Sequence, residues 1–198
     1  MFNLTHITVK EFFQVDEETS NRYLELQSNM WIYLMKLKEE GKDISFLNKP
    51  FLKYKAKKLG SLSFGNVAQL KRYIANPTYE SLLEAFKMVY GVRQNQYLNA
   101  DVVSFFYALN HIRESVIAIN KKEKQLHSEP DADLQNAGVE RLNRFGEMGT
   151  LINLGKQYAK SPAEIEEWKY NLVYAILLYD KVHGEIKKKY DEIKKPTP

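Results

Sequence analysis

The chain has 198 residues with 29 basic and 25 acidic side chains, which leave a net charge of +4 at pH 7. Hydrophobic residues make up 44% of it, enough for the core of one domain. It contains no cysteine, which excludes disulfides, thiolate nucleophiles and cysteine-based zinc sites, and which is typical of a reducing, intracellular environment. The positive excess is too small to indicate nucleic-acid binding by itself.

The first residues lack the basic and apolar regions of a secretory signal. The longest apolar stretch, residues 172–179, is far shorter than the roughly 20 residues that a membrane span needs. We therefore expect a protein that does not associate with membranes. We also expect one helical domain over residues 1–198, with a separate N-terminal subregion over residues 1–60 as the alternative.

Helical patterns follow one another through the first half of the chain. Thr8 and Glu11 have the spacing of a capping box, which predicts a short helix that carries Phe12 and Phe13. Apolar residues at helical spacing, ended by glycine or proline, predict the next helices. These cover residues 17–40, 51–59, 66–75 and 77–90. Residues 61–64 are one of two weak candidates for a strand.

Two long helices are predicted in the second half, over residues 99–126 and 162–195. In the first, Val102, Leu109 and Val116 recur every seven residues, as do Phe105, Ile112 and Ile119. In the second, Ser161, Pro162 and Glu164 form an N-terminal cap, and Ile165, Leu172, Tyr179, Ile186 and Ile193 recur every seven residues. Such series are typical of helices that pack lengthwise. We therefore expect the series of the first long helix to be buried against that of the second. Shorter helices over residues 132–144 and 150–159 complete an all-α, multi-helix bundle.

The sequence offers no pattern of catalytic or metal-binding residues. Its four histidines lack metal-ligand spacing, and its serines lack the turn glycines of a nucleophile elbow. Gly146 and Gly149 have the GxxG spacing of a nucleotide clamp, but Glu147 between them favours a turn at a helix end. We therefore predict a protein that is not an enzyme and that needs no cofactor or metal.

Lysines and tyrosines are the remaining candidates for a binding role. The lysines at 121–124 and 187–195 lie in the last turns of long helices, where the helix dipole favours cations, and those at 53–58 spread around a solvated helix. Nucleic-acid binding is therefore the less favoured alternative. Tyr33, Tyr170, Tyr174 and Tyr190 lie off or beside the apolar series. Tyrosine suits a protein–protein interface because it combines an apolar ring with a polar tip. These four are the candidate partner-binding residues, with partly buried packing as the alternative.

Four segments resemble helical proteins encoded in the morphogenesis clusters of tailed bacteriophages, most nearly the tail assembly chaperones. The segments are LSFG at 62–65, FKMVYG at 86–91, NAGVERLNRFG at 136–146 and WKYNLV at 168–173. The resemblance covers about half of the chain, and residues 1–60 add nothing to it.

This resemblance implies a non-enzymatic role in the host cytoplasm. Tail assembly chaperones keep the apolar, helical tape-measure protein soluble until the tail tube polymerises around it. The implied partners are therefore other phage assembly or virion proteins, and we expect the isolated protein to self-associate. A permanent virion subunit, such as a head–tail connector or a scaffold, is the alternative.

Overall fold

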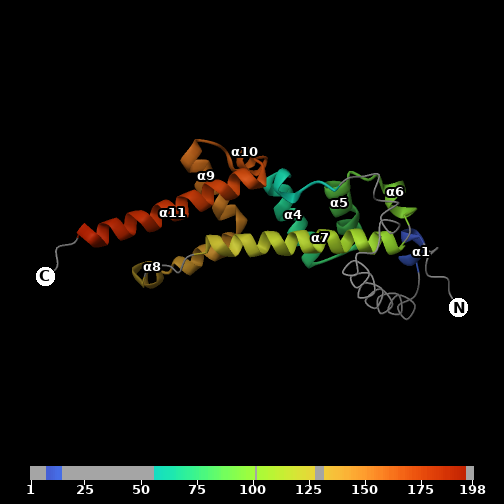
Figure 1. Cartoon of the computed structure of the whole chain (residues 1–198), viewed down its shortest axis with the longest axis horizontal. Helices are drawn as coiled ribbons and strands as arrows, with labels where there is room; N and C mark the ends of the chain where they lie inside the picture. The colour runs from blue at the N-terminus through green and yellow to red at the C-terminus, as the bar shows by residue number, and fades with distance from the viewer. Residues whose placement is uncertain (1–7, 15–55, 101, 128–131, 195–198) are drawn as a thin grey trace, which may run out of the picture. The chain divides into compact units, whose positions relative to one another are not determined.

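The computed structural model describes residues 8–14, 56–100, 102–127 and 132–194 (Figure 1). The fold is all-α, as predicted, and the described residues contain one isolated β-bridge. The helices are α1 (Val9–Phe12), η2 (Leu59–Ser61), α4 (Phe64–Ala75), α5 (Tyr79–Tyr90), α6 (Gln94–Leu98), α7 (Val102–Glu123), η3 (Lys124–Leu126), α8 (Ala132–Asn136), η4 (Val139–Phe145), α9 (Glu147–Tyr158), α10 (Pro162–Glu166) and α11 (Tyr170–Lys194). The helix predicted over residues 17–40 and most of that over 51–59 lie outside the described residues.

The chain divides into two compact units. The first comprises residues 1–57 and 72–115, and the second comprises residues 58–71 and 116–198. Helices α4 and α7 contribute residues to both units, so the boundary does not follow a linker. The single domain expected from the sequence therefore stays a prediction, as does a subregion over residues 1–60.

Side-chain caps set the beginning of several helices. The Thr8 hydroxyl accepts a hydrogen bond from the Glu11 N–H at 3.3 Å, and the Glu11 carboxylate accepts one from the Thr8 N–H at 2.8 Å. This capping box confirms the short helix predicted there. Helix α5 begins one residue after Thr78, whose side chain caps it, and ends at Gly91 with a φ of +67°.

The first long helix begins three residues later than predicted. Asn99, the first residue of the predicted range, instead closes α6, and its side-chain amide donates to the Asn95 carbonyl at 2.8 Å. Helix α7 then begins at Val102, and its last turn tightens into η3. Both of its seven-residue series, from Val102 and Phe105 onward, are buried, as predicted.

Aromatic rings form the core of the first unit. The rings of Phe86 and Phe105 are stacked 5.2 Å apart, and the edge of Tyr97 meets both rings at 5.2 and 5.7 Å. Phe12 meets Phe106 edge to face at 5.2 Å. These offset and perpendicular geometries are the ones that aromatic quadrupoles favour. The cluster therefore joins α1, α5, α6 and α7 in one core.

The second unit corrects the longest predicted helix. A single helix over residues 162–195 is wrong, because α10 ends at Glu166 and α11 begins at Tyr170. Between them, the Phe64 N–H donates to the Trp168 carbonyl at 2.7 Å, and the Tyr170 N–H donates to the Leu62 carbonyl at 2.9 Å. This pairing includes the bridge between Ser63 and Lys169, and it takes the place of helical hydrogen bonds. The predicted cap at Ser161 is confirmed and begins α10.

The region between α7 and α10 is also more divided than predicted. The helix expected over residues 132–144 is split into α8 and η4, and the one expected over 150–159 begins earlier as α9. Gly138 separates the first two with a φ of +79°. Gly155 lets α9 and α10 approach closely, because a Cβ there would lie 2.6 Å from the Lys160 carbonyl oxygen.

The buried Tyr97 hydroxyl has no hydrogen-bond partner among the residues that the structure describes. Burial raises the pKa of this hydroxyl well above its usual value, and the neighbouring Tyr79 adds to the shift. We therefore expect Tyr97→Phe to raise the free energy of unfolding by about 1 kcal/mol, because it removes a desolvated polar group. Urea denaturation followed by circular dichroism measures the change.

Tyr170→Phe is the matched control, because the Tyr170 hydroxyl donates to Glu123 Oε1 at 3.1 Å. It should lower the free energy of unfolding by about 1 kcal/mol. A loss of stability in Tyr97→Phe would contradict the interpretation of its hydroxyl.

Candidate functional site

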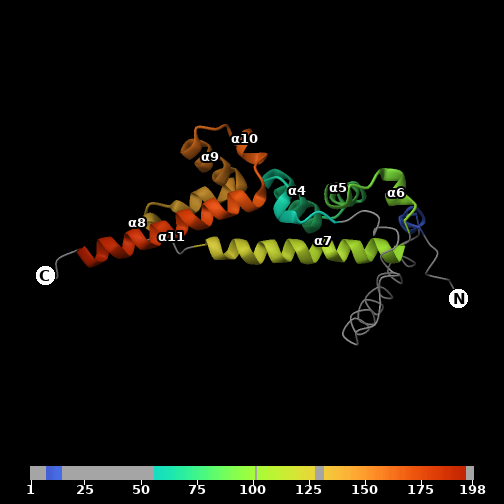
Figure 2. The same cartoon turned by 45° about the horizontal axis from the view of Figure 1, so that its top comes forward.

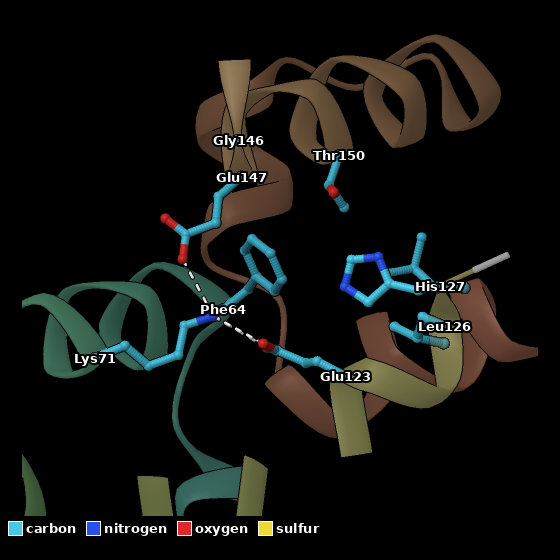
Figure 3. A pocket seen from close by; sticks show the side chains of 9 residues that line it. Phe64, Lys71, Glu123, Leu126, His127, Gly146, Glu147 and Thr150 are labelled. Atoms are coloured by element: carbon cyan, nitrogen blue, oxygen red, sulfur yellow. Dashed lines mark hydrogen bonds and ion pairs between the residues drawn. The ribbon is translucent and has the colours of Figure 1, made fainter. Parts of the chain in front are cut away.

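A pocket of about 460 Å³ opens in the second unit (Figure 3). Its apolar walls come from Phe64 on α4, Leu126 on η3 and Leu177 on α11. Lys71, Glu123, His127, Gly146, Glu147 and Thr150 complete the lining. This size suits a small molecule or one or two side chains of a partner protein.

Lys71 lies at the polar wall of this pocket between two carboxylates (Figure 3). Its Nζ donates to the two oxygens of Glu123 at 2.9 and 3.1 Å and lies 3.2 Å from Glu147 Oε1. All three side chains are about three-quarters buried. Glu147 is the first residue of α9, where the helix dipole favours a negative charge. The cluster therefore ties the end of α7 and the start of α9 to α4.

Sequence reasoning missed this cluster and its pocket. Lys71 is 52 residues from Glu123 and still farther from Glu147, so no local spacing connects them. The GxxG segment nevertheless lies beside the pocket. Gly146 joins η4 to α9 with a φ of +48°, a conformation that favours glycine, and Gly149 lies inside α9. The turn predicted at Gly146 is therefore confirmed.

The candidate tyrosines that the structure describes differ in burial and in hydrogen-bond partners. Tyr33 lies outside the described residues. Tyr170 is buried, stacks on Phe64 and Tyr174, and donates to Glu123, which favours the alternative of packing within the chain, and its role in partner binding stays a prediction. Burial and the Glu123 carboxylate both raise the pKa of its hydroxyl. The Tyr174 hydroxyl donates to Gln125 Oε1 at 3.0 Å, which favours partly buried packing.

Tyr190 alone of the described candidates is exposed, and it belongs to a longer exposed row on α11. This α11 row consists of Leu172, Tyr179, Val182, Ile186, Tyr190 and Ile193, whose exposed fractions range from 44 to 75%. At 3.6 residues per turn, their side chains lie within a stripe about 80° wide. In both views the C-terminal turns of α11 run away from α9 and α10 (Figure 1, Figure 2).

The exposed row corrects the predicted packing of the second long helix. Ile165 is buried, but the next four members of its seven-residue series, from Leu172 onward, are exposed. The opposite face of α11 is the one that packs, through Tyr170 and Val173. Lys181 connects the packed face of α11 to the segment after α7, since its Nζ donates to the Gln125 and His127 carbonyls at 2.7 and 2.9 Å. The seven-residue series from Leu172 onward therefore forms an exposed apolar surface on α11.

Comparison of the chain with protein-family models, curated proteins and solved structures finds no match. Among the described residues, no helix is both long and apolar enough to cross a membrane. The same residues contain no group of three or more His, Asp or Glu side chains placed to hold a metal ion. The α11 row and the pocket are candidate sites within the part of the chain that the structure describes.

We expect Lys71→Met to lower the free energy of unfolding by about 1–2 kcal/mol, because it leaves two partly buried carboxylates without their shared cation. In a double-mutant cycle with Glu147→Gln, the two losses should not add. Chemical denaturation of the four proteins measures the coupling. Lys160→Met is the control, because the Lys160–Glu164 pair is exposed and should contribute little. Additive losses would contradict the cluster.

We expect Leu172→Asp to change the free energy of unfolding of the dilute protein by less than about 0.5 kcal/mol, because half of this side chain is exposed. Its neighbour Val173 is fully buried, so Val173→Asp should cost more than about 3 kcal/mol. Thermal and urea unfolding measure both. Equal losses in the two variants would mean that the α11 row is buried.

Proposed function

We propose that this protein acts by protein–protein contact, without catalysis, in the assembly of a tailed-bacteriophage tail or virion. The leading form of the proposal is a transient assembly chaperone in the host cytoplasm. Its client is an apolar helical protein such as the tape-measure protein. The sequence resemblance supplies the phage context, and the α11 row supplies the physical basis for contact.

The observation that carries the proposal is the exposure of the α11 row. Six large apolar side chains on one helix face form a larger patch than scattered surface residues do, and such patches mark interaction sites. A client helix with its own apolar stripe fits this face, because amphipathic helices bind partners through residues at seven-residue spacing. The second unit has further exposed apolar residues on η4 and α9, namely Leu142, Phe145 and Met148.

A permanent virion subunit is the second candidate. The seven-residue spacing of Leu172, Tyr179, Ile186 and Ile193 is compatible with it, because spacing of this kind suits lasting helix pairs as well as transient ones. The two candidates differ in where the protein ends up. A chaperone leaves the finished particle, whereas a connector or scaffold subunit is a component of the particle or of its precursor.

We expect the affinity-tagged protein, purified from cells in which the phage is assembling, to bring down the tape-measure protein. We also expect it to be missing from mature particles. Mass spectrometry of the eluate and of the particles measures both. Stoichiometric presence in particles would favour the structural subunit instead.

Paired variants connect this experiment to the α11 row. Ile186→Asp should lose the tape-measure protein, because it places a charge at the middle of the row. Ile117→Asp should retain it, because Ile117 is also an exposed isoleucine of the second unit but lies on α7. A wild-type protein that associates with neither tail proteins nor particles would contradict the proposed function.

A further inference from the structure

The two sides of α11 differ in what they contact. Val173 is buried, Tyr170 is bonded to Glu123, and Lys181 is bonded to two backbone carbonyls, so this side is fixed to its own unit. The α11 row lies on the other side of the helix and is exposed in the same structure in which Tyr170 and Val173 are buried. A partner can therefore cover the row without unfolding the unit.

We propose that in the isolated protein a second copy of this chain covers the α11 row, in an antiparallel pair of α11 helices. The inference rests on the proposed function in taking the row as a docking surface, and it names the occupant of that surface. A row with a seven-residue repeat is complementary to itself, because residues on one helix pack between those of an identical helix. Pairing of identical surfaces also gives the closed two-fold dimer that is most common among oligomers.

The exposed area is sufficient for such a dimer. A large side chain covers about 150–250 Å², so the exposed fractions of the six row residues amount to on the order of 700 Å² per chain. Complete coverage of the row in two copies would bury on the order of 1,400 Å², an upper limit that lies within the range of about 1,200–2,000 Å² found for stable interfaces. The row alone supplies this area, with no contribution from the rest of the chain.

The lysine cluster of α11 favours one orientation of the two helices. Lys187, Lys188 and Lys189 follow Ile186 directly, and Lys189 continues the seven-residue series of Val182. In a parallel pair the two lysine clusters would lie side by side and repel. In an antiparallel pair centred between Val182 and His183, each cluster lies opposite the uncharged residues 176–178 of the second copy.

The same centre pairs four of the six row residues with one another, and it places Tyr190 opposite Ala175. Leu172 of one copy lies opposite Ile193 of the second copy, and Tyr179 lies opposite Ile186. Val182 lies opposite His183 of the second copy, so the two Val182 side chains are neighbours beside the two-fold axis. Each copy thus contributes every large side chain of the seven-residue series to one continuous apolar strip.

Sedimentation of the purified full chain, with no other protein present, tests the pairing. We expect a dimer for the wild type and for Ile117→Asp, and a monomer for Ile186→Asp, whose dissociation constant should rise at least about a hundredfold. Circular dichroism should show all three folded, because both isoleucines are more than half exposed. A wild-type monomer, or an Ile186→Asp dimer as stable as the wild type, would overturn the inference.

Engineered cysteines test the orientation, since the chain has none of its own. Val182→Cys should cross-link to its own copy on oxidation. Leu172→Cys and Ile193→Cys should form a disulfide only when the two variants are mixed. Asp191→Cys, on the side of the helix away from the row, should form none. Cross-linking of Leu172→Cys alone would overturn the antiparallel arrangement.

The outcomes separate this inference from the proposed function. A monomeric wild type that still brings down the tape-measure protein would overturn the dimer and leave the proposed function standing. A dimer that associates with no tail protein and no particle would support the inference and contradict the proposed function.

Discussion

The short backbone pairing between residues 62–64 and 168–170 is the constraint on which the second unit depends. Two hydrogen bonds, from Phe64 to Trp168 and from Tyr170 to Leu62, end α10 and fix where α11 begins. Because a helix turns by about 100° per residue, that starting point decides which residues face the unit and which face outward. Tyr170 and Val173 thereby face inward, and the apolar row that includes Leu172 faces outward.

Local chemistry made much of the fold predictable. The caps at Thr8 and Ser161, the terminating Gly91 and the buried series of α7 all depend on residues within one or two turns of each other. The break before Tyr170 was not predictable in this way, because its cause lies about a hundred residues earlier in the chain. Periodicity in residues 162–195 correctly indicated helix, but it could not distinguish a face buried in the same chain from one left for a partner.

In the candidate sites, too, local sequence patterns showed some features and missed those that depend on contacts between distant residues. Position beside an apolar series could not distinguish a tyrosine that packs in its own unit, as Tyr170 does, from an exposed one such as Tyr190. The pocket around Lys71 joins residues from four segments, and only their folding brings them together. The α11 row, by contrast, includes a seven-residue series that is visible in the sequence, although we predicted that series to be buried and it is exposed. It offers exposed apolar side chains rather than reactive groups.

The division of α4 and α7 between the two compact units has a consequence for anyone who tries to take this protein apart. Each unit is assembled from separate stretches of chain, and two of the crossings occur inside helices. A protease that cuts a loop cannot release either unit intact. Nor can a shortened gene encode one unit without severing a helix in mid-turn. Deletion mapping, the usual route to a minimal binding fragment, should therefore be replaced in this protein by point substitutions in the full chain.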